Sequence, residues 1–307
     1  MSKIAFLYPG QGAQVCGMGQ DFYEQTETGK RIFDKATELM GFSMPQLCFE
    51  ENDRLDITEY TQAAMVTASI AMMRVLEENG IKPDVAAGLS LGEYCALAAA
   101  GVMSDEDAIR TVRQRGILMQ EAVPVGEGAM AAILALDAAA IEEVTGAMEG
   151  VWIANYNCPG QIVISGEKAA VEEACEKLKA AGAKRAVMLN VSGPFHSGML
   201  ADAGEKLGEV LSQVELHEPQ IPYVANVTAQ YVKSAAEVKE LLTRQVSSSV
   251  RWQQSVEAMI ADGVDTFIEI GPGKTLAGFM RKISRDVKTL NVENLEDIGK
   301  VAEALKS

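Results

Sequence analysis

The sequence predicts an α/β protein in which a mostly parallel sheet is interrupted by a small ferredoxin-like unit. Strand-like and helix-like segments alternate over most of the 307 residues, a pattern typical of parallel sheets covered by helices. In the middle of the chain the order changes to βαββαβ, the order of a ferredoxin-like unit. Because the alternation then resumes, we expect residues 127–196 to form an inserted subdomain, and residues 1–126 with 197–307 to form the large domain.

Two strands and three helices are expected before the insertion. A glycine-rich turn, Gly10-Gln11-Gly12, follows the first strand, and the first helix stops where Gly80 and Pro83 interrupt its periodicity. A short apolar strand then leads into an alanine-rich helix that ends at Gly101. In chain order these elements are strand 3–8, helix 61–79, strand 85–89, helix 93–100 and helix 105–121.

The insertion and the last part of the chain are predicted from the same two periodicities. In the insertion we expect strand 129–136, helix 138–148, strand 151–157, strand 161–165, helix 168–181 and strand 183–191. After it we expect helix 200–211, strand 221–227, helix 255–262 and strand 265–270.

The composition excludes several classes of protein. With 48% hydrophobic residues the chain can bury a large core, so it is not a disordered protein. Its 27 Lys and Arg against 43 Asp and Glu give a net charge of −16, whereas a nucleic-acid-binding protein needs a basic face. The N-terminus is predicted to be a strand rather than a signal peptide, and no apolar run is long enough for a membrane span. We therefore expect an acidic cytoplasmic protein that binds neither nucleic acid nor membrane.

The five cysteines lie far apart and form no CxxC pair. Neither a metal site nor a disulfide framework is expected from this spacing. Two glycine-rich segments also lack the residues that their motifs need. Val15 stands where a dinucleotide fingerprint requires glycine, and Ile268 stands where a phosphate loop requires its first glycine. Neither NAD nor ATP is therefore expected as a cofactor.

The most informative segment is Gly88-Leu89-Ser90-Leu91-Gly92, which matches G-x-S-x-G between a predicted strand and a predicted helix. In this context the pattern forms a sharp turn that exposes the serine hydroxyl at the end of the sheet. The backbone N–H of Leu91 would open the helix and point at a developing oxyanion. An ordinary strand-to-helix turn is the alternative, and the context favours catalysis by Ser90.

A nucleophilic serine needs a base, and the chain contains two histidines. His196 lies in a loop with glycine and proline between a strand and a helix, a common place for a catalytic base. His217 has charged and proline neighbours and is predicted to be an exposed surface residue. No convincing carboxylate to orient His196 precedes it, since Asp137 and Glu167 are candidates by chain order alone.

Arg115 lies within the predicted helix 105–121 together with Arg110 and Arg113. Composition alone favours a solvated helix face for these three residues. A binding role for Arg115 would require its guanidinium to point into the site, where it can hold a carboxylate through two hydrogen bonds.

Taken together, seven collinear segments resemble the malonyl-CoA:acyl carrier protein transacylases of fatty acid synthesis, and the resemblance spans almost the whole chain. They are Phe6-Leu7-Tyr8-Pro9-Gly10-Gln11-Gly12-Ala13-Gln14, Gly88 to Glu93, Arg115-Gly116 with Met119-Gln120, Asn155-Tyr156-Asn157-Cys158-Pro159-Gly160-Gln161, Gly193-Pro194-Phe195-His196-Ser197, Gln245 with Val250-Arg251-Trp252, and Glu269-Ile270-Gly271-Pro272-Gly273. The resemblance implies a hydrolase-like α/β domain with an inserted ferredoxin-like subdomain, in agreement with the predicted order of elements.

The resemblance also implies roles for single residues. Ser90 is the expected nucleophile and His196 its base, oriented by the backbone carbonyl of Gln245 rather than by a carboxylate. The N–H groups of Gln11 and Leu91 are expected to form the oxyanion hole.

Five further residues are expected to bind substrate. Arg115 would pair with the free carboxylate of a malonyl group, and Phe195 before the histidine favours malonyl over methylmalonyl. The remaining expected substrate-binding residues are Met119, Asn155 and Asn157.

The implied activity is transfer of malonyl from malonyl-CoA to the phosphopantetheine thiol of acyl carrier protein, without a metal or redox cofactor. A stand-alone acyltransferase of polyketide synthesis and a serine thioesterase or hydrolase remain as alternatives. A monomer is expected by default. Because carrier proteins are acidic, docking needs a local basic patch, and one candidate, with a solvated helix face as its alternative, comprises Lys274, Arg281, Lys282, Arg285 and Lys288.

Overall fold

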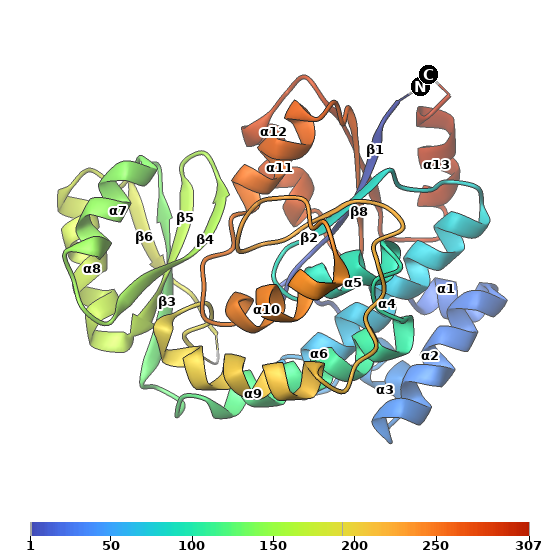
Figure 1. Cartoon of the computed structure of the whole chain (residues 1–307), viewed down its shortest axis with the longest axis horizontal. Coiled ribbons are helices and arrows are strands. Elements are labelled where there is room, and N and C mark those ends of the chain that lie inside the picture. Colours follow the sequence, from blue (N-terminus) through green and yellow to red (C-terminus); the bar gives the residue numbers. More distant parts are fainter. Residues whose placement is uncertain (1, 192, 307) are drawn as a thin grey trace.

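The computed structural model describes residues 2–191 and 193–306 and contains two separate sheets (Figure 1). The larger sheet has five strands, all parallel, in the order β7-β2-β1-β8-β9. Its strands are β1 Ile4–Tyr8, β2 Val85–Gly88, β7 Tyr223–Val224, β8 Thr266–Ile270 and β9 Lys288–Val292. The parallel α/β core predicted from the sequence is thereby confirmed.

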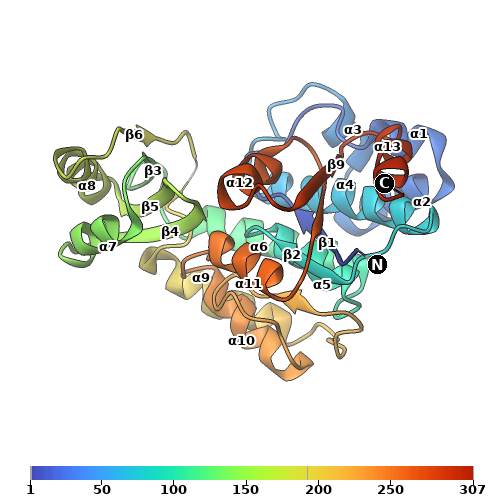
Figure 2. The ribbon, with the colours of Figure 1, turned by 90° about the horizontal axis from the view of Figure 1, so that it is seen from above.

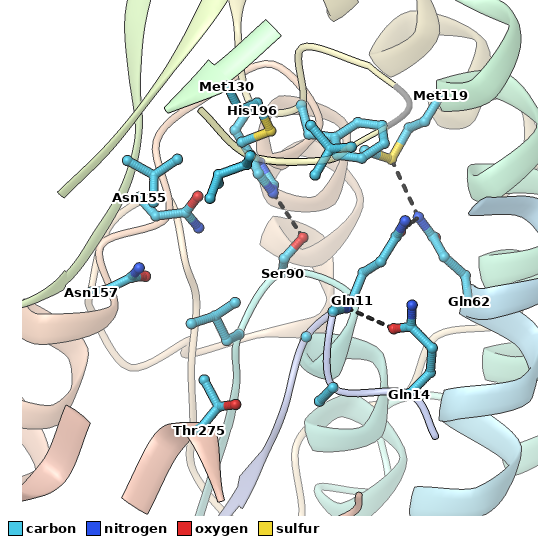
Figure 3. Close-up of a pocket in the computed structure, with 18 of the residues that line it drawn as sticks. Gln11, Gln14, Gln62, Ser90, Met119, Met130, Asn155, Asn157, His196 and Thr275 are labelled. Carbon is cyan, nitrogen blue, oxygen red and sulfur yellow. Dashed lines mark hydrogen bonds between the residues drawn. The ribbon is translucent and has the colours of Figure 1, made fainter. Parts of the chain in front are cut away.

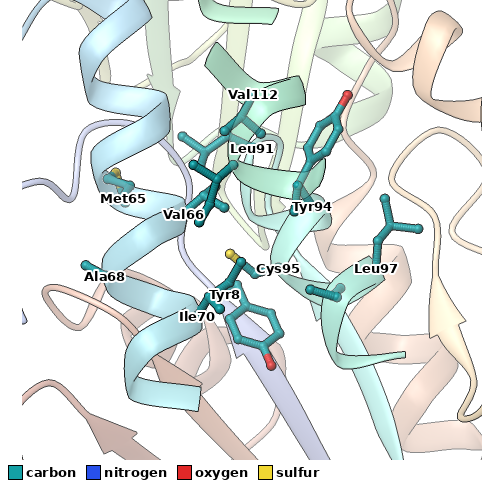
Figure 4. Close-up of a cluster of buried hydrophobic side chains, with 14 of the residues drawn as sticks. Tyr8, Met65, Val66, Ala68, Ile70, Leu91, Tyr94, Cys95, Leu97 and Val112 are labelled. Atoms are coloured by element: carbon teal, nitrogen blue, oxygen red, sulfur yellow. The ribbon is translucent and has the colours of Figure 1, made fainter. Parts of the chain in front are cut away.

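Helices cover both faces of this sheet, so the central strand β1 is apolar on both sides. Phe6 and Tyr8 point into the core on one face, while Ala5 and Leu7 point into the core on the other. The first face is covered mainly by α4 Thr58–Glu78, α5 Gly92–Ala99 and α6 Asp105–Glu121, and the second by α11 Trp252–Ala261 and α12 Thr275–Ile283. Figure 4 shows the packing of α4 and α5 residues around Tyr8 in the first core.

The smaller sheet is antiparallel and has the order β4-β5-β3-β6, with its own core beneath two helices (Figure 2). This is the strand arrangement of a ferredoxin-like unit, and the predicted βαββαβ order is confirmed. Its elements are β3 Gly128–Leu134, α7 Ala138–Gly146, β4 Val151–Cys158, β5 Gln161–Glu167, α8 Lys168–Ala180 and β6 Arg185–Met188. The domain boundaries at residues 126/127 and 196/197 remain a prediction.

The smaller sheet is joined to the large core by backbone hydrogen bonds at Val250. The Tyr156 N–H donates to the Val250 carbonyl over 2.9 Å, and the Val250 N–H donates to the Ala154 carbonyl over 2.8 Å. These two bonds form a short parallel bridge between β4 and the segment after α10 Ala235–Gln245. β4 is therefore hydrogen-bonded to the residue that lies five positions after Gln245.

Two predicted strands are much shorter in the structure. The strand expected over 221–227 is only β7, because the chain turns after it and the Ala225 N–H donates to Gln230 instead (3.0 Å). The strand expected over 183–191 is only β6, because the chain bends back and the Val191 N–H donates to the Leu189 carbonyl (3.1 Å).

Other helices surround these layers, and several had no prediction. α9 Ala201–Leu211 matches the helix expected there, preceded by one 3-10 turn, Gly198–Leu200. The elements without a prediction are α1 Gln20–Gln25, α2 Glu27–Met40, α3 Met44–Phe49, α10, α12, β9 and α13 Asp297–Ala304. In the part of the chain that the structure describes, no helix combines the length and apolar character needed to cross a membrane.

Candidate active site

The G-x-S-x-G segment forms the sharp turn between β2 and α5. Ser90 adopts a left-handed conformation with φ of 54°, which is uncommon for a residue with a side chain. A Cβ on Gly88 would lie 1.9 Å from the Gly92 carbonyl oxygen, and one on Gly92 would lie 2.3 Å from the Tyr8 carbonyl oxygen. Only glycine fits at either position, so the motif is needed for the turn itself.

The Asn226 side chain holds this turn from the other side. Its Oδ1 accepts a hydrogen bond from the Ser90 N–H (2.7 Å), and its Nδ2 donates to the Gly88 carbonyl (2.7 Å). Asn226 is fully buried just beyond β7. The strained backbone of Ser90 is therefore stabilised by a side chain from the segment that follows the neighbouring strand.

Ser90 and His196, both predicted site residues, contact each other directly (Figure 3). The Ser90 Oγ lies 2.7 Å from His196 Nε2, and His196 Nδ1 lies 2.8 Å from the Gln245 backbone carbonyl. Since a carbonyl only accepts, Nδ1 carries the proton, and Nε2 is free to accept the serine proton. Burial, together with the charge of Arg115, lowers the pKa of His196 to about 4, so the imidazole is neutral at pH 7.

The two carboxylates considered as partners of His196 lie in the smaller sheet's unit instead. Asp137 caps α7 by accepting a hydrogen bond from the Ala139 N–H, and Glu167 is exposed at the end of β5. His217 is exposed, as predicted. The position facing Nδ1 is thus occupied by a backbone carbonyl.

The two backbone amides predicted for an oxyanion hole are available as donors. Within residues 2–191 and 193–306, neither the Gln11 N–H nor the Leu91 N–H donates a hydrogen bond. Leu91 is the N-cap residue of α5, and Gln11 lines the same cavity as Ser90. A free amide suits a developing negative charge, and that of Leu91 also lies at a helix N-terminus.

Arg115 is 1% exposed, so the solvated helix face that composition favours is wrong for this residue. Its guanidinium donates to Gln62 Oε1 (2.8 Å), to Ser90 Oγ (3.1 Å) and to Gln245 Oε1 (3.1 Å). All three acceptors are neutral, and no carboxylate lies within 4.0 Å of the Arg115 guanidinium in the described part of the chain. A buried cation with neutral partners is suited to binding an anionic ligand.

These side chains face a cavity of about 700 Å³ that is bounded by elements of both sheets. Asn155 and Asn157 reach it from β4, and Met119 reaches it from α6 (Figure 3). Phe195 also lines it beside His196, and Thr275 marks the start of α12 at its edge. Gln11, Ser90, Arg115, Met119, Asn155, Asn157, Phe195 and His196, all predicted site residues, line this one cavity.

Three buried polar residues of the site carried no assigned role in the sequence analysis. Gln62 had a possible signal, since it is a large polar side chain next to the apolar run 63–66 of its helix. Glu93 ends the recognised motif but has no role in the usual account of a nucleophilic turn. Asn226 stands in an irregular segment and had no signal at all. In the described residues, no three His, Cys, Asp or Glu side chains are grouped so that they could hold a metal ion.

The comparisons with known proteins agree on one family. The family described as acyl transferase domain matches residues 5–303. The malonyl CoA-acyl carrier protein transacylase of Bacillus subtilis (strain 168) is 50% identical over 311 aligned residues, covering 100% of this chain and 98% of the relative. The crystal structure of the Clostridium perfringens enzyme of that name has a TM-score of 0.96 at 42% identity, covering 99% of this chain and 98% of that one.

A third similar structure is a complex. It contains a malonyl-transacylase bound to its holo type II PKS acyl-carrier protein, and it has a TM-score of 0.95 at 40% identity over 99% of this chain and 100% of that one. The serine turn, the histidine and the buried arginine thus lie in a fold shared along its whole length. The chain belongs to the acyl transferase family, and within it to the malonyl CoA-acyl carrier protein transacylases.

Proposed function

We propose that the protein transfers the malonyl group of malonyl-CoA to the phosphopantetheine thiol of an acyl carrier protein, through a malonyl ester on Ser90. A relative that matches its full length is named malonyl CoA-acyl carrier protein transacylase, and a similar enzyme forms a complex with a carrier protein. The single observation that carries the proposal is the contact of Ser90 with both His196 and the buried cation Arg115. A serine nucleophile beside an anion-binding group suits an acyl group with a free carboxylate.

In the first half-reaction His196 Nε2 removes the Ser90 proton as Oγ attacks the thioester carbonyl. The resulting oxyanion accepts hydrogen bonds from the Gln11 and Leu91 amides. When the carbon–sulfur bond breaks, the imidazolium returns the proton to the leaving CoA thiolate. The Gln245 carbonyl keeps the imidazole in the tautomer that these transfers need.

In the second half-reaction the pantetheine thiol of the carrier protein gives its proton to His196 and attacks the malonyl ester. The same two amides hold the second oxyanion, and the proton on His196 then goes to Ser90 Oγ as the ester bond breaks. Every proton and leaving group is handled by this chain's own residues, so the proposed mechanism requires no cofactor. The five cysteines are free thiols, which suits a reducing cytoplasm.

The proposed function is tested by mixing the protein with malonyl-CoA alone and recording an intact mass spectrum with peptide mapping. We expect one malonyl group on Ser90, and added holo acyl carrier protein is expected to remove it. Free malonate with unmodified protein would instead indicate a hydrolase. If the protein forms no adduct and turns over no malonyl-CoA, acyl transfer is contradicted altogether. Comparing carrier proteins of fatty acid and polyketide synthesis as acceptors separates the two pathways.

We also propose that the basic cluster near α12 is where the carrier protein docks. Its residues do not share one helix face: Arg281 and Lys282 lie on α12, Lys274 is its N-cap, and the others follow the helix. Arg281 and Lys282 are exposed. Thr275, Leu276 and Phe279 of the same helix line the cavity, so a partner bound here would be close to the entrance.

Charge reversal tests this surface. We expect Arg281→Glu with Lys282→Glu to raise KM for the carrier protein about tenfold while leaving malonyl-Ser90 formation from malonyl-CoA unchanged. The matched control reverses Lys30 and Arg31, which are also adjacent, exposed and helical, but lie on α2. Unchanged carrier-protein kinetics in the α12 variant would contradict docking at this surface.

A further inference from the structure

Glu93 is a buried carboxylate for which the proposed mechanism has no use. It lies in the first turn of α5, three residues after Ser90, and is 1% exposed. Its Oε2 accepts hydrogen bonds from Gln245 Nε2 (2.7 Å) and from the Asn226 N–H (3.2 Å). Both donors are neutral amides, so its negative charge has no ion-pair partner at hydrogen-bond distance in the described residues.

The Gln245 amide lies between this carboxylate and Arg115. Its Nε2 faces Glu93, while its Oε1 accepts from the Arg115 guanidinium (3.1 Å). The carboxylate and the guanidinium therefore face each other across one amide group, and their attraction favours the charged form of Glu93. In a buried site such an attraction acts over a longer distance than in water.

The other titratable groups around Glu93 keep one charge state near neutral pH. Burial raises the pKa of Tyr94 on α5 and of Tyr223 on β7 above the usual range, so both stay neutral. His196, reached through the Gln245 carbonyl, is neutral, and the Arg115 guanidinium is charged. Burial raises the pKa of Glu93 to about 7, against the opposing effect of its hydrogen bonds and of Arg115. Among these groups, Glu93 is the one that changes charge near pH 7.

We propose that Glu93 is the counter-charge of Arg115 in the free enzyme, and that it takes up a proton from solvent when a malonyl carboxylate binds Arg115. This inference rests on the proposed function. Once the malonyl carboxylate is present, two buried anions share one cation, and the anion with the higher pKa becomes neutral; burial already raises the pKa of Glu93 to about 7. Both hydrogen bonds to Glu93 fall on Oε2, so a proton on Oε1 preserves them. When malonyl leaves, the proton returns to solvent.

The first test is the pH dependence of malonyl binding. Above about pH 7 an ionised Glu93 must be protonated for malonyl to bind, so KM for malonyl-CoA is expected to rise up to tenfold per pH unit. Glu93→Gln keeps an oxygen that accepts the same two hydrogen bonds but cannot ionise. We expect its KM to be nearly flat over this range. Acetyl-CoA, which has no free carboxylate, serves as the matched substrate and is expected to show no such rise with the unmodified protein.

The second test measures the proton itself and does not require a change at Glu93. Calorimetric titration of the Ser90→Ala protein in buffers of different ionisation enthalpy gives the number of protons bound with each ligand. At about pH 8 we expect the protein to take up more protons on binding malonyl-CoA than on binding acetyl-CoA. The comparison with acetyl-CoA corrects for proton exchange by the phosphates of CoA. In the doubly substituted protein, Ser90→Ala with Glu93→Gln, the difference should vanish.

The outcomes separate this inference from the proposed function. Equal proton numbers for malonyl-CoA and acetyl-CoA, or an unchanged malonyl profile in Glu93→Gln, would overturn the role of Glu93 while leaving malonyl transfer intact. A protein that forms no malonyl-Ser90 at any pH would instead contradict the proposed function. A merely structural role for Glu93 would lower activity equally at every pH and for both acyl groups.

Discussion

Replacing Ser90 by alanine is expected to lower malonyl transfer by about 10⁵-fold or more, since removal of a nucleophile abolishes the covalent route. The reason is local: the Oγ atom lies 2.7 Å from His196 Nε2 and 3.1 Å from the Arg115 guanidinium, and the alanine methyl group can replace neither contact. The measurement is the rate at which labelled malonyl passes from malonyl-CoA to holo acyl carrier protein, together with the mass of the protein after incubation.

A matched control is available in the smaller sheet. Ser165 on β5 is fully buried, and its Oγ has no hydrogen-bond partner in the described structure, so Ser165→Ala removes a hydroxyl without breaking a bond. We expect that variant to keep its activity. A Ser90→Ala protein that still acquires a malonyl group would show that another residue is the nucleophile.

Replacing Arg115 by alanine is expected to affect malonyl transfer and acetyl transfer differently. Truncating one partner of a buried charge pair typically costs 2–5 kcal/mol, so kcat/KM for malonyl transfer should fall at least about 30-fold. Acetyl transfer should be spared or raised, because acetyl has no carboxylate to pair and the buried charge is gone. The ratio of the two rates, measured with malonyl-CoA and acetyl-CoA, is the quantity to follow.

Arg110→Ala on the same helix is the control, since its side chain is exposed and, among the described residues, forms ion pairs with neighbouring carboxylates of α6. Equal losses for malonyl and acetyl in Arg115→Ala would contradict selection through this residue. They would be the result expected if Arg115 acted only by supporting the Ser90 turn.

The serine turn and the histidine that contacts it were predictable because their signals are local. Gly88 and Gly92 leave no room for a Cβ, so the motif itself specifies the geometry at Ser90. His196 stood out because it lies in a loop with glycine and proline, whereas His217 has charged and proline neighbours. Most strands of the two sheets and most helices packed on them were also predicted, since strands and helices each show a characteristic hydrophobic periodicity.

What could not be predicted depends on contacts between distant segments. Arg115 is 53 positions from Gln62 and 130 from Gln245, and only the folded chain reveals that these side chains surround its guanidinium. Asn226 carries no pattern, because its function in the turn comes from its place beside β2. β7 was predicted too long because a sequence does not reveal where a short edge strand loses its partner.

The bridge between β4 and Val250 has a mechanical consequence. Moving the smaller sheet away from the larger one would break the two backbone hydrogen bonds at Val250. Val250 lies five residues after Gln245, whose carbonyl accepts the hydrogen bond of His196 Nδ1. Opening and catalytic alignment are therefore opposed, because a wider entrance would cost the imidazole its orientation. We expect the entrance to keep a nearly constant width, so that acyl groups are discriminated by the shape and charge of a rigid opening rather than by closure around them.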